Sequence, residues 1–286
     1  MPSLLSGGCS VFELNRGGRE GDEAFIRWDP AGKTIDISRL EGMDAVVHLA
    51  GESLGKGRWS RRKKSRIYSS RVDGTRFLCE SLAKLEQAPK VIVSASAVGY
   101  YGNRGNEVLT EDSEPGSGFL AHVCRGWEES TEPARQKGIR VVNLRIGVVL
   151  SPAGGALAQM LPHFQAGAGG VLGSGKQYTS WIAIDDLLSI IESVIRENRL
   201  RGPVNAVARH PVTNRDFAKT LGSVLGRPTV VSVPAFAARM ALGEMADEVL
   251  LASARVEPKM LMETDYSFRY PDLESALRHV LNRHKE

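Results

Sequence analysis

The stretch VIVSASAVGYYG, residues 91–102, decides the fold of this chain. Its first three residues, Val91–Val93, are apolar without alternation, which is typical of a strand buried on both faces of a parallel sheet. Small hydroxyl residues follow, among them Ser96, and the stretch ends in a turn that carries Tyr100. Ligands of open α/β sheets bind beyond the carboxyl ends of the strands. We therefore expect a ligand site where this strand ends.

Strands and helices are expected to alternate on both sides of this stretch. Apolar runs predict buried strands at residues 44–50 and 141–150, and a shorter strand at residues 11–14. Helical spacing of apolar residues predicts helices over residues 58–85 and 119–137. This alternation favours βαβ units and a doubly wound parallel sheet, the architecture of the α/β class.

The second half of the chain differs from the first in glycine content and in the regularity of its expected elements. Glycines crowd residues 154–175, and helices are expected at intervals up to the end of the chain. Thr213 followed by Asp216 resembles a capping box and predicts a helix start there. We therefore divide the chain into a main α/β domain over residues 1–150 and a small α+β lobe over residues 151–286, partly interleaved with the sheet.

Composition excludes several classes of protein. Of 286 residues, 42% are hydrophobic and 24% charged, as in globular proteins, and the net charge of +4 is mild. Three cysteines at unrelated spacings form no metal-ligand pattern and no even disulfide set, so we expect reduced thiols and a cytoplasmic location. No apolar run approaches a membrane span. The basic run at residues 58–66 has little aromatic interleaving, so we expect neither a nucleic acid nor a membrane as partner.

Seven longer strings of this chain are distinctive: DAVVHLAGE (44–52), SASAVGYYG (94–102), LRIGVVL (144–150), GGALAQMLP (154–162), LGSGKQYTSWIAIDD (172–186), GPVNAVA (202–208) and GEMA (243–246). They closely resemble one subfamily, the atypical short-chain dehydrogenases/reductases labelled epimerase family or sugar nucleotide-dependent epimerase-like. The match runs over nearly the whole chain from Gly8 onward.

The resemblance implies a Rossmann domain with a small C-terminal lobe, and it implies NADP(H) as the cofactor. The expected activity is hydride transfer between the nicotinamide and a small carbonyl or hydroxyl compound, with a homodimer as the expected assembly. Some relatives carry a cell-division-inhibitor label. The alternative is therefore a catalytically silent cofactor-binding or regulatory protein.

The N-terminus departs from the pattern of a dinucleotide-binding unit. Such a unit opens with a strand, a glycine loop and a helix, about 30 residues before its second strand ends. Here the second strand already ends at Arg16. We expect that the first strand and the glycine loop are missing, a truncation of roughly 15–20 residues. The loop's backbone N–H groups normally hold the pyrophosphate, so weak dinucleotide binding is expected.

The acid/base residues depart from the pattern as well. In the wider superfamily, hydride transfer uses a Ser or Thr, a Tyr, and a Lys four residues after the Tyr. The resemblance aligns the Ser with Ser96, but the helix FLAHVCRGWEE (119–129) holds no Tyr-x-x-x-Lys. We predict Ser96 and Tyr100 as the catalytic pair, with Tyr100 standing in from the adjacent turn. The alternative for Tyr100 is packing of its phenol at the sheet edge.

Cofactor contacts are expected where the strands at residues 11–14 and 44–50 end. An arginine at the end of the second Rossmann strand suits a 2′-phosphate, which predicts that Arg16, with Asn15 beside it, contacts NADP. Plain solvent exposure is the alternative for Arg16. After the strand at residues 44–50, the backbone of Leu49, Ala50, Gly51 and Glu52 is expected to approach the adenosine and ribose.

Further contacts are expected from three other places in the chain. Arg71, and less strongly Arg66, lie on the helix where a side chain could reach the cofactor. Val149 is expected to line the nicotinamide side, with ordinary core burial as the alternative. Tyr178 and Trp181, in the loop with Lys176 and Gln177, are candidate substrate contacts. For the remaining candidates we predict structural roles. His48 is predicted to be a core histidine, and Asp185 and Asp186 are predicted to cap the next helix.

Overall fold

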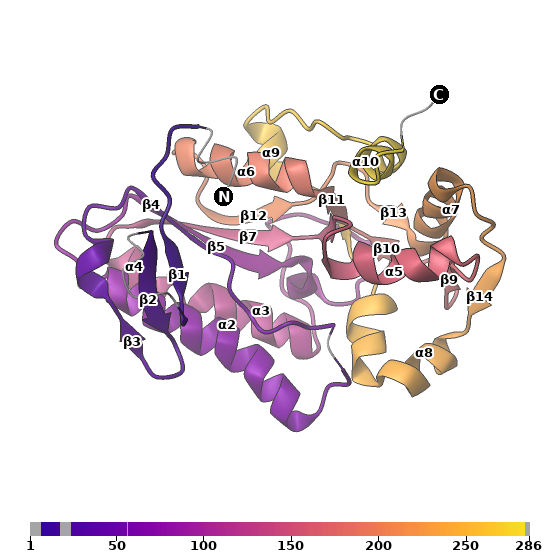
Figure 1. The fold of residues 1–286 in the computed structure, drawn as a ribbon, viewed down its shortest axis with the longest axis horizontal. Helices are drawn as coiled ribbons and strands as arrows, with labels where there is room; N and C mark the ends of the chain where they lie inside the picture. Colours follow the sequence, from indigo (N-terminus) through magenta and orange to yellow (C-terminus); the bar gives the residue numbers. More distant parts are fainter. Residues whose placement is uncertain (1–6, 18–23, 56, 284–286) are drawn as a thin grey trace.

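A four-stranded parallel sheet lies at the centre of the molecule (Figure 1). The computed structural model describes residues 7–17, 24–55 and 57–283. The strand order is β12-β7-β5-β4, and each neighbouring pair is parallel. The bounds are β4 Ala45–His48, β5 Val91–Ala97, β7 Arg140–Ile146 and β12 Gly202–Ala206. The predicted α/β architecture with a parallel sheet is confirmed.

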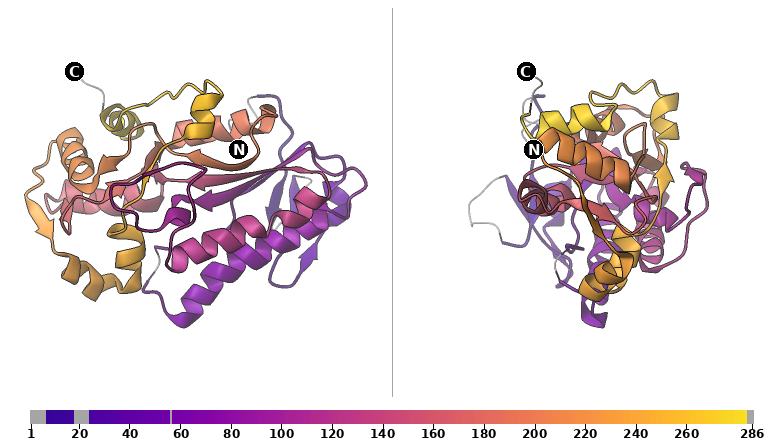
Figure 2. Two further views of the ribbon diagram at one scale, coloured as in Figure 1. Left: turned by 180° about the vertical axis from the view of Figure 1, so that it is seen from behind. Right: turned by 90° about the vertical axis from the view of Figure 1, so that its right-hand side faces the viewer.

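Helices cover both faces of this sheet (Figures 1 and 2). Helices α2 (Arg61–Leu82), α3 (Phe119–Glu129) and α4 (Glu132–Gln136) lie on one face, and α6 (Ile184–Arg196) and α9 (Lys259–Glu263) lie on the other. Strand β5 therefore buries its side chains on both sides. Ile92 packs in the cluster beneath α2, whereas Val91 and Val93 pack in the cluster with α6. This double burial explains why the strand shows no polar alternation.

The N-terminal strands form a small sheet of their own. Strands β1 (Glu13–Asn15) and β2 (Phe25–Asp29) are parallel, and β2 is antiparallel to β3 (Thr34–Ile35). In the part of the chain that the structure describes, β4 pairs with β5 alone. The sequence-based expectation of a missing first strand and glycine loop stays a prediction.

A second packing unit surrounds the carboxyl ends of the sheet. Its buried core joins helices α5, α7 and α10 to short strands, with Trp181 and Phe217 among its large residues. The remaining elements are η1 Ile37–Leu40, η2 Val98–Tyr101, β6 Val108–Leu109, β8 Val148–Leu150, α5 Gly155–Gln165, β9 Gly170–Leu172, β10 Tyr178–Thr179, β11 Trp181–Ala183, β13 Val212–Thr213, α7 Asn214–Leu225, β14 Val231–Val233, α8 Ala235–Leu242, the π-helix η3 Ala246–Leu250, β15 Arg255–Val256 and α10 Leu273–Val280.

Two elements predicted as continuous are each split in two. The helix expected over residues 119–137 breaks after Glu129, and Pro133 lies in the first turn of α4. In an uninterrupted helix Pro133 would lack its hydrogen bond and clash with the preceding turn. The strand expected over 141–150 breaks at Gly147, where an added Cβ would lie 2.6 Å from the Ser180 carbonyl oxygen. β8 then pairs with β11 instead of continuing the sheet.

The helix-start predictions have mixed outcomes. Thr213 caps α7 as expected, because its hydroxyl accepts the Asp216 backbone N–H at 3.2 Å. The expected capping by Asp185 and Asp186 is wrong, since α6 begins after Ala183 without a side-chain cap. The Asp186 carboxylate instead accepts the backbone N–H groups of Arg269 and Tyr270, and so holds the segment before α10.

Candidate active site

Three polar residues form a row across neighbouring strands near their carboxyl ends. The register pairs Ser96 of β5 with Arg145 of β7, and Arg145 with Asn205 of β12. In-register residues of a parallel sheet point to the same face. Glu128 of α3 meets this row, so the row lies on the side of the sheet that α2 and α3 cover.

Arg145 and Glu128 form a buried ion pair at the centre of the row. Arg145 Nε donates to Glu128 Oε1 and Nη2 donates to Oε2, both at 2.9 Å, and the arginine side chain is only 3% exposed. Burial opposes the charge of Arg145, but the hydrogen bonds and the charge of Glu128 outweigh burial and raise the pKa of Arg145. The guanidinium therefore stays charged, and the two-point contact fixes its plane.

Ser96 is held by the same carboxylate. Its hydroxyl donates to Glu128 Oε1 at 2.7 Å, and the residue is 2% exposed. Since a hydroxyl has one proton, Ser96 must turn away from Glu128 before it can donate to a substrate oxygen.

The two tyrosines of η2 lie against Arg145. The Arg145 Cζ atom is 3.5 Å from the centroid of the Tyr100 ring, and Arg145 Nη1 donates to the Tyr101 hydroxyl at 3.0 Å. Tyr101 is fully buried, its hydroxyl donates to Asn205 Oδ1 at 2.7 Å, and burial raises its pKa to about 12. Tyr100 is half-buried, so of the two phenols Tyr100 is the one with access to a ligand.

Glu111 closes the network from the loop that follows β6. Its Oε1 accepts the backbone N–H of Asn205 at 2.9 Å and that of Met260 at 3.3 Å, while its buried Oε2 has no partner. Burial raises the pKa of Glu111. The loop comes close because Gly116 carries no side chain, since an added Cβ would lie 2.0 Å from the Tyr101 carbonyl oxygen.

The chain after β4 brings an arginine against bare backbone. The guanidinium of Arg71 lies beside Gly51, where an added Cβ would be 3.1 Å from Arg71 Cζ. Arg71 Nη1 donates to the carbonyl oxygens of Glu52 and Ile67 at 3.0 and 3.3 Å, and burial lowers the pKa of Arg71. Among the described residues no carboxylate lies within ion-pair distance of it. The guanidinium also lies over the Trp127 ring, with Cζ 5.1 Å from the ring centroid. A half-buried cation that contacts carbonyl oxygens and an aromatic ring but no carboxylate is suited to an anionic ligand.

The other predicted cofactor residues surround this place or lie at the surface. Glu52 is occupied by Lys63 at 2.6 Å, with Arg66 at 3.5 Å. Leu49 is 53% exposed although it is apolar, and Ala50 and Gly51 are exposed with it. Asn15 and Arg16, at the end of β1, are exposed too, which leaves both interpretations of Arg16 open.

The structure separates the predicted substrate residues. Tyr178 is half-buried, with the Arg255 guanidinium 5.2 Å from its ring centroid, whereas Lys176 is exposed. Trp181 is 0% exposed and donates to the His210 carbonyl oxygen, so it lies in the core and presents no surface to a ligand. Gln177 is also buried and donates to the backbone. Val149 is half-buried in β8.

Sequence reasoning missed Glu128, Arg145, Glu111 and Asn205. The available signal was a charge inside an apolar strand, since Arg145 stands in VVNLRIGVVL and a buried arginine requires an acidic partner. The prediction for His48 is confirmed. It is buried, its Nε2 lies 3.0 Å from the Thr75 hydroxyl, and desolvation lowers its pKa to about 4.

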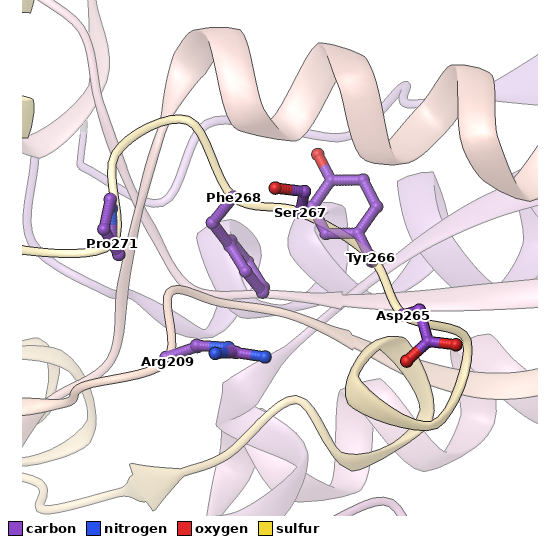
Figure 3. Close-up of a pocket in the computed structure, with 6 residues that line it drawn as sticks. All are labelled: Arg209, Asp265, Tyr266, Ser267, Phe268 and Pro271. Carbon is purple, nitrogen blue, oxygen red and sulfur yellow. The ribbon is translucent and has the colours of Figure 1, made fainter.

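A cavity of about 350 Å³ lies elsewhere, between Arg209 and the segment that joins α9 to α10 (Figure 3). Figure 3 shows Arg209 and Phe268 reaching toward the same space, and Arg209 Cζ is 6.0 Å from the Phe268 ring centroid. None of the predicted site residues lines this cavity.

Together, the parallel sheet and the helices on both faces define a Rossmann-like α/β protein. The polar groups at the carboxyl edge of the sheet form its candidate ligand site. Residues 2–206 match the NAD dependent epimerase/dehydratase family. The chain belongs to this family, which confirms the resemblance found in the sequence. Residues 233–280 match a domain of unknown function, DUF1731.

Relatives from distant organisms share most of the chain. The Epimerase family protein Mb2239 of Mycobacterium bovis is 41% identical over 258 residues, which cover 90% of this chain and 85% of that protein. The chloroplastic Epimerase family protein SDR39U1 homolog of Arabidopsis thaliana is 42% identical over 244 residues, 85% of this chain and 70% of that protein.

A solved relative has the same fold. The crystal structure of human epimerase family protein SDR39U1 (isoform2) with NADPH superimposes with a TM-score of 0.90 at 31% identity, over 99% of this chain and 94% of that one. Within residues 7–17, 24–55 and 57–283, no helix combines the length and the hydropathy that crossing a membrane requires.

Proposed function

We propose that this chain binds NADP(H) and transfers hydride between the nicotinamide and a small carbonyl or hydroxyl compound. The observation that carries the proposal is the guanidinium of Arg71, which lies against the exposed backbone of Gly51 with no carboxylate partner among the described residues. The choice of cofactor is supported by the family and by the human relative, whose crystal structure is one with NADPH.

The residues present fit a dinucleotide along the carboxyl edge of the sheet. Arg71 would face a phosphate, and the backbone of Leu49–Glu52 would lie against the adenosine and ribose. Arg16 would face the 2′-phosphate, which distinguishes NADP from NAD. Val149, in β8, would line the nicotinamide side. When bound, the cofactor supplies or accepts the hydride.

The chain's own contribution to the chemistry is made by two hydroxyl groups. Tyr100, the more exposed of the paired phenols, gives a proton to the reacting oxygen or takes one from it. Ser96 orients that oxygen once its hydroxyl has turned from Glu128. Tyr178 contacts the substrate, and its half-buried position supports this role.

Turnover of NADPH with a panel of aldehydes and ketones tests the proposal. With a carbonyl that is reduced, we expect Ser96→Ala to lower kcat about tenfold or more, because a hydrogen bond to the reacting oxygen is lost. Ser94→Ala is the matched control, since Ser94 lies two residues earlier on the same face of β5 and does not contact Glu128. Unchanged turnover in Ser96→Ala removes the proposed role of Ser96. Tight NADPH binding without turnover of any carbonyl favours the silent cofactor-binding protein.

A cytoplasmic location and a homodimer are further predictions from the sequence. Light scattering behind size-exclusion chromatography measures the assembly, and a fluorescent fusion reports the location. The chloroplast label of the plant relative belongs to that protein and makes the second measurement worth doing.

A further inference from the structure

Arg145 has an unusual position for an arginine whose charge is already paired. Glu128 accepts from two of its donor groups, and its guanidinium lies over Tyr100 with Cζ 3.5 Å from the ring centroid. A positive charge against the ring stabilises the ionised form of the phenol. Tyr100 is also the less buried of the two tyrosines that Arg145 contacts.

The charges around Tyr100 come from three elements. Arg145 faces it from β7, Glu128 from α3, and Glu114 from the loop before α3. Burial is the largest effect and raises the pKa of Tyr100; the charge of Arg145 lowers it, whereas Glu128 and Glu114 raise it. Among these charges Arg145 is therefore the one that favours the ionised phenol.

We propose that Arg145 is a positioning residue of this site, whose guanidinium stabilises the phenolate formed when Tyr100 gives its proton to a substrate oxygen. This inference rests on the proposed function. In the reduction, the carbonyl carbon takes the hydride of NADPH and the carbonyl oxygen takes the proton of Tyr100. An alcohol and NADP⁺ result, and the phenolate regains its proton from solvent.

Glu128 has a second part in this arrangement. Its bidentate contact fixes the guanidinium over the tyrosine ring, and its Oε1 also holds the Ser96 hydroxyl. One carboxylate therefore sets the positions of both predicted catalytic side chains. The helix α3, which carries no Tyr-x-x-x-Lys, contributes to the site through Glu128.

The direct test measures the ionisation of the phenol at position 100 without any substrate. Tyr100→3,5-difluorotyrosine brings the titration nearer neutral pH and provides a single ¹⁹F signal. In a background of Arg145→Met, we expect the pKa of this phenol to rise by about one unit or more, because the nearest cation is lost. In Arg145→Lys, which keeps a charge, the rise should be smaller. An equal pKa with and without Arg145, in proteins of native circular dichroism, overturns the inference.

Two further variants keep this test decisive. Arg140→Met is the matched control, because Arg140 lies on the same strand but donates to the backbone carbonyls of Val194, Ile195 and Leu200. We expect no shift there. If Arg145→Met does not fold, the double variant Arg145→Met/Glu128→Gln leaves no buried unpaired carboxylate, and the pKa of the phenol is expected to rise because the guanidinium 3.5 Å from the ring centroid is lost.

Turnover separates this inference from the proposed function. With a reduced carbonyl, Arg145→Lys should move the alkaline limb of the kcat–pH profile and leave the KM for NADPH unchanged. A shifted phenol pKa without turnover of any carbonyl would refute the proposed function, and of the assignment of Arg145 it would leave only the electrostatic effect on Tyr100. A normal phenol pKa with normal turnover would do the reverse.

Discussion

At the scale of single residues, two arginines removed from solvent differ in whether a carboxylate pairs with them. Arg145 is buried and fully paired with Glu128, whereas Arg71 is half-buried and donates only to backbone carbonyl oxygens. Burying a cation is costly unless a partner compensates. The paired arginine is therefore suited to organise its neighbours, and the other is suited to receive an anion from outside.

Replacing Arg71 tests that distinction. We expect Arg71→Met to raise the Kd for NADPH about tenfold or more, because a charge-assisted contact to a phosphate is lost. Fluorescence titration of NADPH measures the change. Arg76→Met, on the exposed side of the same helix, is the control and should leave the Kd as it is. Equal affinities for the Arg71 variant and the parent chain would contradict the phosphate assignment.

His48 makes the stability of the fold depend on pH. Its pKa is about 4 in the folded chain, because burial excludes the charged ring, and 6.5 is the ordinary value. Between these values the unfolded chain binds a proton that the folded chain does not. Stability contributed by neutral His48 is therefore complete above about pH 6.5 and falls by about 3 kcal/mol as the pH drops to 4.

Urea denaturation at pH 7 and pH 5 measures this dependence. His48→Gln retains a partner for the Thr75 hydroxyl without a titrating ring, so we expect a smaller loss of unfolding free energy between the two pH values. The same loss in both proteins would show that another group is responsible.

At the scale of elements, the sequence predicted the sheet well and the site only in part. Val91–Val93 and DAVVHLA were readable as buried strands because their apolar runs are local signals. The break at Pro133 was missed although a proline inside a helical pattern is a local signal. The break at Gly147 depends on the carbonyl of Ser180, far along the chain, and has no local signal. Ser96 and Tyr100 were found from a strand end, but Glu128 and Asn205 join them only through packing of α3 and β12.

The contact between α3 and the sheet depends on Glu128. We expect Glu128→Gln to lower the free energy of unfolding by about 3 kcal/mol, because Arg145 is left as a buried charge with a neutral partner. Chemical denaturation measures the loss. Glu129→Gln, the exposed neighbour, is the control, and Glu128→Gln/Arg145→Met should recover part of the stability. A single variant as stable as its control would contradict this account of the ion pair.

At the scale of the whole molecule, the segment of residues 243–250 is tied to the helices that cover the sheet. Glu248 of η3 accepts the backbone N–H groups of Phe119 and Leu120 at 3.1 and 2.9 Å, at the start of α3. Lys64 of α2 donates to Glu244 at 2.7 Å. Gly118 permits the first contact, because an added Cβ would lie 2.4 Å from Glu248 Oε1.

Removing the carboxylate of Glu248 should loosen this connection. We expect Glu248→Ala to cost about 1 kcal/mol of stability, the usual effect of losing a helix N-terminal cap. Hydrogen exchange should also become faster in the first turn of α3 and over residues 235–250. Asp247→Ala loses only an exposed ion pair with Arg239 and should change neither quantity. Exchange that is unchanged in Glu248→Ala would show that other contacts hold residues 235–250 against α3.

The partners of Glu111 have a consequence for the order of events during synthesis. The carboxylate needs Asn205 and Met260, and β6 beside it pairs with β15, which ends at Val256. A nascent chain folds from its N-terminal end while the rest is still being made. Tyr100 and Ser96 therefore leave the ribosome long before the segment that completes their surroundings. The part of the site that Glu111 and β6 form therefore stays incomplete until nearly the whole chain has been synthesised.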